Sequence, residues 1–213
     1  MTDALERGIA ARAAAYGIGL GPEATAALAT HARAVLASAE RLHLTTVTDP
    51  EELLRRHVGE SLAGAVALEP GIRGRLVDLG SGNGYPGIPL AVARPGLTAT
   101  LVEASARKAE FLRDTVRAAR LAAVEVFHGQ VQRPADLPEA DPIMVLASRA
   151  MGGWERVVPR FAAALAPEGR VLLWAGEDTD RVLRRTAWRR LQLVDRLPLP
   201  DRERSWVFVL RRA

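Results

Sequence analysis

The sequence predicts an α/β protein built on a mostly parallel, seven-stranded sheet, with a helical extension at its N-terminus. Three observations lead to this prediction. From Arg75 onward, short apolar runs alternate with amphipathic segments, which is the pattern of parallel βαβ units with right-handed crossovers. A glycine-rich turn follows the first of these runs, and two strand-like runs close together end the sequence. We divide the chain into a helical part, residues 1–72, and a sheet-containing part, residues 73–213.

Three helices are expected in the first part. Residues 2–16 and about 23–41 carry apolar side chains at helical spacing. Residues 42–50 are polar and β-branched, so we expect a loop there. Asp49-Pro50 should start the third helix, because an early proline and acidic residues in the first turn favour a helix N-terminus. Pro70-Gly71 then ends the helical part.

The second part is expected to hold seven strands and four helices. Apolar runs predict strands at residues 75–79, 98–103, 124–128, 143–147, 170–174, 191–197 and 206–210. Amphipathic segments predict helices at about residues 86–94, 105–120, 153–166 and 178–190. A polar turn around Asp201–Arg204 joins the last two strands, which we expect to pair as a hairpin.

The composition narrows the class of protein. Of 213 residues, 48% are hydrophobic and 25% are charged, which is ordinary for one soluble domain. The absence of cysteine excludes disulfides and cysteine-based metal sites, and we assign no metal site. No apolar run approaches the roughly 20 residues of a membrane span, and no signal peptide is evident. We therefore expect a cytoplasmic protein with no membrane partner.

The charge is basic and almost entirely arginine. The net charge is +4, and Lys108 is the only lysine. A basic balance suits nucleic acid, because arginine pairs well with phosphate. An Ala- and Arg-rich composition can equally reflect a GC-rich genome.

The glycine-rich turn is the candidate ligand site. Its glycines are Gly80, Gly82, Gly84 and Gly87, which allow positive φ and a close approach of backbone N–H groups to a ligand. The N-terminus of the helix that follows offers unpaired backbone N–H donors and a partial positive charge to an anionic group. A dinucleotide site requires Gly-x-Gly-x-x-Gly, whose third glycine would fall at Tyr85. The spacing therefore argues against a nicotinamide dehydrogenase.

The observed pattern, Asp78-x-Gly-x-Gly-x-Gly84, resembles the first motif of S-adenosylmethionine (SAM)-dependent methyltransferases. Glu103 closes the next apolar run, about 20 residues after the turn, where an acid can accept hydrogen bonds from ribose hydroxyls. A solvated strand end is the alternative for Glu103. The loop and the acid together favour a nucleoside-containing cofactor.

The turn continues as Tyr85-Pro-Gly-Ile-Pro-Leu90, and this extension resembles the RsmG (GidB) family, which methylates N7 of a guanine in bacterial 16S ribosomal RNA. Other stretches are similar to the family, and together they run from about residue 35 to 176. These stretches are Leu44–Pro50, Arg56-His57 with Glu60-Ser-Leu62, Arg107-Lys108 with Phe111-Leu112 after Glu103, and Ala147–Ala150.

The resemblance implies a class I SAM-dependent methyltransferase with a Rossmann-like sheet, which acts as a monomer on 16S ribosomal RNA or the small ribosomal subunit. It implies that SAM is bound by eight residues: Asp78, Gly80, Gly82, Tyr85, Glu103, Val131, Gln132 and Arg149. The glycines would shape the methionine pocket and Asp78 would steady the loop or the amino group. Tyr85 would contact the cofactor through its backbone. Glu103 would bind ribose, Val131 and Gln132 would flank adenine, and Arg149 would touch the cofactor or RNA.

Catalysis at guanine N7 needs no general base, because N7 carries a free lone pair and no proton. Methyl transfer is then largely a matter of positioning. We assign no catalytic residue, and none of the four histidines is required as a base. The product gains positive charge, so a nearby acid or aromatic face would help.

Three departures from the family pattern keep alternatives open. Gln130-Val-Gln132 stands where the family has Arg-x-Glu, Ala175-Gly176 where it has Lys-Gly, and His43 where it has Asn. The alternatives are a divergent paralogue that methylates another RNA or a small molecule, and a non-catalytic SAM- or RNA-binding module.

Overall fold

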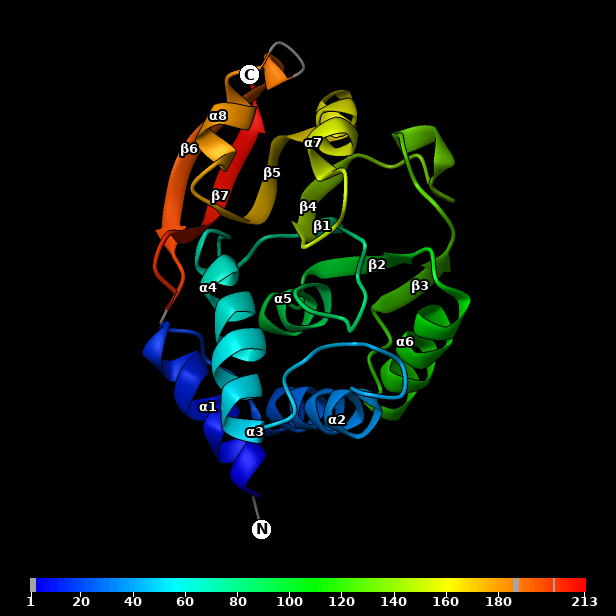
Figure 1. The fold of residues 1–213 in the computed structure, drawn as a ribbon, viewed down its shortest axis with the longest axis vertical. Helices are drawn as coiled ribbons and strands as arrows, with labels where there is room; N and C mark the ends of the chain where they lie inside the picture. Colours follow the sequence, from blue (N-terminus) through cyan, green and yellow to red (C-terminus); the bar gives the residue numbers. More distant parts are fainter. Residues whose placement is uncertain (1–2, 186–187, 201) are drawn as a thin grey trace.

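The computed structural model describes residues 3–185, 188–200 and 202–213, and these residues form one seven-stranded sheet flanked by helices (Figure 1). The strand order is β3-β2-β1-β4-β5-β7-β6. The strands are β1 (Gly74–Leu79), β2 (Leu97–Glu103), β3 (Val124–His128), β4 (Ile143–Arg149), β5 (Leu165–Gly176), β6 (Leu191–Pro198) and β7 (Ser205–Arg212). Strands β1 to β5 pair in parallel, and β7 is antiparallel to both β5 and β6. The predicted mostly parallel sheet and its terminal hairpin are confirmed.

The strand order reverses at β1. The chain moves outward from β1 to β2 and β3, and then returns to place β4 on the other side of β1. Ligands of such sheets bind at the carboxyl ends of the strands beside this reversal. Gly80, Glu103 and Arg149 all lie at that edge.

The N-terminal part forms a helical layer against one face of the sheet (Figure 1). It consists of α1 (Ala4–Ala15), α2 (Pro22–Ser38), α3 (Pro50–Leu53), the π-helical turn η1 (Leu54–Gly59) and α4 (Glu60–Val66). The three predicted helices are confirmed, with the third interrupted by η1. One hydrophobic core joins this layer to the sheet, since Ile9, Leu28 and Leu62 belong to the same buried cluster as Leu76 and Leu172. The division at residue 72 stays a prediction.

The other helices follow individual strands. They are α5 (Gly87–Ala93), α6 (Ala106–Ala118), η2 (Pro134–Asp136), α7 (Trp154–Val157), η3 (Val158–Ala164) and α8 (Thr179–Leu183). A second buried cluster, which includes Val77, Phe161 and Phe208, fills the opposite face of the sheet. Within the described part of the chain, no helix has the length and apolar character needed to cross a membrane.

Three predicted boundaries were wrong. The helix expected at 153–166 is a short α7 followed by the 3-10 helix η3, because Pro159 lacks an N–H and its ring disfavours the regular helix before it. Strand β5 begins at Leu165 instead of residue 170, since Leu165 already pairs with Ile143 across an irregular register. The local sequence Pro167-Glu-Gly169 suggested a break there.

The helix expected at 178–190 is limited to α8, which ends at Leu183. Arginines dominate the residues that follow and give a helix little apolar surface to bury. Residues 186–187 of that predicted helix, and Asp201 of the predicted turn, lie outside the described residues.

Helix α4 packs closely on β5 through Trp174. The indole Nε1 donates a hydrogen bond to the Glu60 carbonyl at 2.8 Å, and the ring lies directly over Gly64. A Cβ atom at Gly64 would overlap the Trp174 ring. The absence of a side chain at this position therefore sets the distance between the helical layer and the sheet.

Substituting Gly64→Ala should lower the free energy of unfolding by about 1–3 kcal/mol, because an added methyl group overpacks a closely packed contact. Gly71→Ala is the matched control, since a Cβ there meets nothing within 4 Å. Urea unfolding followed by tryptophan fluorescence measures both. Equal stability of the two variants would contradict the proposed packing.

Candidate functional site

The glycine-rich loop after β1 has the backbone conformation that its sequence predicts. Gly80, Gly82 and Gly84 have φ values of 73°, 53° and 89°, which side-chain-bearing residues rarely adopt. Space is also limited, because a Cβ at Gly84 would lie 2.8 Å from His31 Nε2 and one at Gly80 would lie 3.0 Å from Met151 Cγ. The loop thus presents backbone to its surroundings at all three positions.

Glu103 holds this loop against the end of β2. One carboxylate oxygen accepts a hydrogen bond from the Gly82 N–H at 2.8 Å, and the other accepts from the Ser105 N–H at 2.7 Å. The side chain is buried. A carboxylate offers about four lone-pair positions, so two remain for ligand donors. The alternative of a solvated strand end does not describe this residue.

Asp78 lies buried beneath the same loop. Its Oδ2 accepts from the Gly87 N–H at 3.2 Å, which ties the start of α5 to the end of β1. Its Oδ1 is buried and has no hydrogen-bond partner among the described residues. Burial raises the pKa of Asp78 to about 7. The site therefore contains an acceptor that a cationic or N–H donor would satisfy.

The side chain of Tyr85 points into the helical layer. Its ring stacks between His31, at a centroid distance of 4.2 Å, and His57, at 5.1 Å. The side chain is buried, and its N–H donates to Asn83 Oδ1 at 3.3 Å. The Tyr85 side chain is therefore unavailable to a ligand, and the contact of its backbone with a cofactor stays a prediction.

The two histidines of this stack are neutral at pH 7. Burial lowers the pKa of His31 to about 4 and that of His57 to about 3, where Arg149 adds to the effect. His31 Nε2 donates to the Asn83 carbonyl at 2.7 Å. His57 Nδ1 accepts from Arg149, so its Nε2 carries the proton and donates to Thr45 Oγ1 at 2.8 Å. His31 is fully buried in the hydrophobic core.

Arg149, at the end of β4, contacts the helical layer. Its Nη1 lies 3.2 Å from the Arg56 carbonyl and 3.4 Å from Glu60 Oε2. Glu60 Oε1 pairs with Arg202 Nε at 2.8 Å. Burial raises the pKa of Glu60, and both arginines oppose that change. Arg149 was expected to touch cofactor or RNA, and that role stays a prediction.

Val131 and Gln132 lie on the segment that follows β3. Val131 is buried in the second core cluster, whereas Gln132 is exposed. The Gln132 and Arg133 N–H groups donate to Asp136 Oδ2, at 2.9 and 3.1 Å. Asp136 therefore shapes this segment. The available signal was Pro134-Ala-Asp136, which is typical of a turn.

Two hollows include residues of α7 in their lining. One, of about 570 Å³, opens between the segment after β4 and the turn after β5, and includes Met151, Trp154 and Glu177 in its lining. The other, of about 480 Å³, is lined mainly by arginine, namely Arg156, Arg160, Arg185 and Arg190, with Glu155, Pro159 and Trp188. Most residues that line these hollows follow β4 or β5 in the sequence. The carboxyl ends of these strands lie at the same edge of the sheet as the glycine-rich loop.

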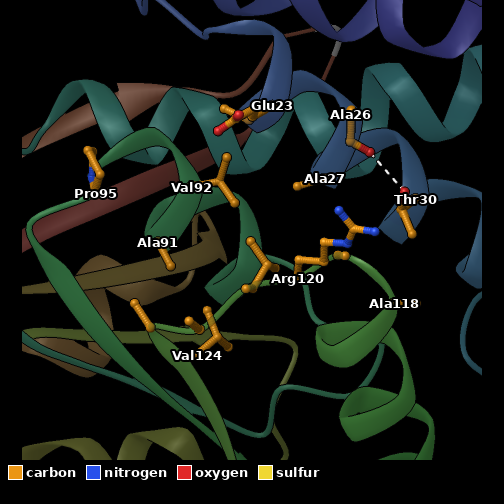
Figure 2. Close-up of a pocket in the computed structure, with 15 residues that line it drawn as sticks. Glu23, Ala26, Ala27, Thr30, Ala91, Val92, Pro95, Ala118, Arg120 and Val124 are labelled. Carbon is orange, nitrogen blue, oxygen red and sulfur yellow. Dashed lines mark hydrogen bonds between the residues drawn. The ribbon is translucent and has the colours of Figure 1, made fainter.

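A further hollow of about 710 Å³ lies away from this edge, where β3 begins and α5 and α6 end (Figure 2). Its walls are largely alanine, with Glu23, Thr30 and Arg120 as polar members. Thr30 Oγ1 is engaged with the Ala26 carbonyl at 2.9 Å. Because it lies away from the carboxyl ends of the strands, we assign it no role in the reaction.

Comparison with known proteins gives a consistent result. A family model described as GidB, rRNA small subunit methyltransferase G, matches residues 24–192. Proteins named ribosomal RNA small subunit methyltransferase G are similar: one from Sorangium cellulosum is 37% identical and covers 85% of this chain and 76% of its own length. One from Chloroflexus aggregans is 33% identical, with coverage of 85% and 77%.

Solved structures are similar in fold at low identity. A ribosomal protein L11 methylase from Lactobacillus delbrueckii subsp. bulgaricus has a TM-score of 0.59 at 12% identity, covering 74% of this chain and 78% of its own. A precorrin-6y C5,15-methyltransferase from Geobacter metallireducens has a TM-score of 0.56 at 13% identity, with coverage of 72% and 87%. The predicted class I methyltransferase fold is confirmed.

Substituting Asp78→Asn should stabilise the protein without ligand by about 2–4 kcal/mol at pH 8. The folded pKa of Asp78 is raised above its usual 3.8 to about 7. Its contribution to stability therefore falls as pH rises from about 4 to 7 and then levels off, whereas an asparagine contributes no such change.

Thermal unfolding between pH 4 and pH 8 measures this effect, with Asp114→Asn as the control because Asp114 is exposed and paired with Arg117. A stabilisation that is the same at both pH values would refute the assigned pKa.

Proposed function

This chain belongs to the GidB family, rRNA small subunit methyltransferase G, and on that premise we propose that it transfers a methyl group from SAM to N7 of a guanine in 16S ribosomal RNA. The same proposal has it act as a monomer in the cytoplasm, on ribosomal RNA or the small ribosomal subunit.

The buried Asp78 Oδ1, which has no hydrogen-bond partner in the described part of the chain, is the observation that best supports SAM as the cofactor. SAM carries an ammonium group and a ribose diol, both of them hydrogen-bond donors. We propose that Asp78 takes the ammonium end, beside Gly80 and Gly82, and that the free lone pairs of Glu103 take the ribose hydroxyls. The Asp78 carboxyl, whose pKa burial raises to about 7, and the Glu103 carboxylate at the neighbouring strand end both offer oxygen acceptors to these two groups.

The adenine end belongs to the segment after β3 in this proposal. Buried Val131 offers an apolar contact, and exposed Gln132 offers an amide that hydrogen-bonds adenine. The Asp136 carboxylate fixes the backbone of this segment through the Gln132 N–H. Tyr85 contributes backbone only, because its ring is held by His31 and His57.

When bound, SAM supplies an electrophilic methyl group. The residues of this chain then have to orient the acceptor and exclude water, because guanine N7 has no proton to remove. Neutral His31 and His57 are buried and engaged with Asn83 and Thr45, so neither serves as a base. Arg149 lies at the end of β4. Its hydrogen bond to the Arg56 carbonyl in the helical layer holds the turn that follows the strand in place.

An RNA substrate is supported by the distribution of arginines. Arg156, Arg185 and Arg190 line the 480 Å³ hollow, and within the described ranges they form no ion pair with an acid. The net charge of +4 agrees with a phosphate-rich partner. Arg55 and Arg56 are weaker candidates, since both pair with Glu52.

Purified protein with radiolabelled SAM should transfer label to small ribosomal subunits or naked 16S RNA, and digestion should release labelled 7-methylguanosine. Label only in a small-molecule pool would favour a paralogue with another substrate. The absence of SAM binding in calorimetry would favour a non-catalytic module.

Substituting Glu103→Ala should weaken SAM binding by about 1–3 kcal/mol, because hydrogen bonds to a charged group are lost and the Gly82 N–H loses its acceptor. The exposed Glu125 on β3 provides the control, Glu125→Ala. Titration calorimetry measures both affinities, with thermal unfolding as a check on folding. Unchanged affinity in Glu103→Ala would remove the ribose assignment.

A further inference from the structure

The hollow of about 570 Å³ beside α7 carries an inference about how the acceptor is recognised. We propose that it holds the target guanine, with Trp154 against the face of the base and Glu177 accepting hydrogen bonds from its Watson–Crick edge. This inference rests on the proposed function, since it names the acceptor pocket of that same site. We call it the acceptor hollow and define it by Met151, Trp154, Trp174, Glu177, Thr179 and Arg204.

Met151 brings the acceptor hollow next to the glycine-rich loop. Met151 lines the hollow, and its Cγ would lie 3.0 Å from a Cβ at Gly80. Met151 is the second residue after the end of β4. The residue between them, Ala150, has a φ of 56°. A non-glycine residue in this conformation is strained and is typical of functional turns. The hollow is therefore next to the region proposed for the methionine end of SAM.

The walls of the hollow suit a flat aromatic ligand. Small residues line much of it, namely Ala150, Gly152, Ala175 and Gly176. Trp154 is half-buried, and its ring is held edge-on by Trp188 at a centroid distance of 5.6 Å. Indole rings stack on nucleobases and also attract cations. The methylated guanine is cationic, so one ring serves both the substrate and the product.

The order of the strands gives the base an orientation. β4 separates β1 from β5, and Glu177 follows β5, on the side of the hollow away from the glycine-rich loop. Neighbouring strands are about 4.8 Å apart, so the segments that follow β1 and β5 leave the sheet roughly 10 Å apart, a span that one base can bridge beyond the end of β4. Guanine presents N7 and O6 on one edge and N–H donors on the Watson–Crick edge. With N7 toward Gly80, those donors face Glu177.

Glu177 is available and oriented for this role. Its carboxylate is 56% exposed, and Arg204 Nη1, which also reaches the hollow, lies 3.4 Å from its Oε1. This ion pair fixes one oxygen and leaves lone pairs on the other. The neighbouring Asp178 also lines the hollow, but it is 83% exposed and pairs with Arg181 on α8, which does not line the hollow. Glu177 is thus the acid placed to read the base.

The test compares Glu177→Ala with Glu168→Ala, an exposed glutamate in the bend within β5 that does not line the hollow. The guanine labelled by the wild-type protein is first mapped, and short RNAs are then made with guanosine or inosine at that position. Inosine keeps N7 and lacks the 2-amino donor. Calorimetry gives the SAM affinity of each variant.

Glu177→Ala should lower kcat/KM for the guanosine RNA by about 10- to 100-fold and lose the preference of the wild type for guanosine over inosine, with SAM affinity unchanged. Glu168→Ala should match the wild type. Trp154→Leu should lower kcat/KM and Trp154→Phe should restore most of it, because phenylalanine keeps a stacking face.

Equal kinetics of Glu177→Ala and Glu168→Ala, or a guanosine preference that survives in Glu177→Ala, would overturn the inference while leaving the proposed function intact. A wild-type protein that transfers no label to ribosomal RNA would instead refute the proposed function, before any variant is compared.

Discussion

The stack of Tyr85 between His31 and His57 is the contact on which the site depends. The three rings come from the glycine-rich loop, α2 and the π-helical turn η1, and all are buried. Aromatic pairs contribute about 0.5–1.5 kcal/mol beyond the area that they bury. The fixed position that the stack gives to the loop matters more here than this energy. The ring of Tyr85 anchors a loop whose glycines have little conformational restriction of their own. The helical layer thus acts as a support for the loop.

A buried ion pair makes a second connection through the same layer. Glu60 on α4 receives Arg149 from β4 and Arg202 from the turn between β6 and β7. A carboxylate this deeply buried is costly unless its charge is compensated, and a single arginine would leave one oxygen without a partner. The three groups therefore fix the relative positions of α4, the end of β4 and the terminal hairpin. Arg149 also holds His57, which joins this cluster to the aromatic stack.

Local patterns in the sequence were sufficient for most of the fold. The strands, the glycine-rich loop and the position of Glu103 at a strand end follow from apolar periodicity and glycine spacing, which depend on nearby residues. The lengths of α7 and α8 and the start of β5 were wrong, because they depend on Pro159 and on pairing with a distant strand. The burial of Tyr85 was not predicted, since His31 and His57 belong to another part of the chain. The eight predicted cofactor residues stay predictions.

The position of β7 in the sheet imposes an order on the folding of this chain during its synthesis. β7 lies between β5 and β6, although it is synthesised after both. A nascent chain can complete β1, β2, β3 and the glycine-rich loop while its later residues are still in the ribosome. β6 has no neighbour in the sheet until β7 emerges, and Arg202 and Arg204 come from the same late hairpin. The half that would receive a cofactor can therefore form before the hairpin, whose Arg204 is the last of the residues that define the acceptor hollow to be synthesised.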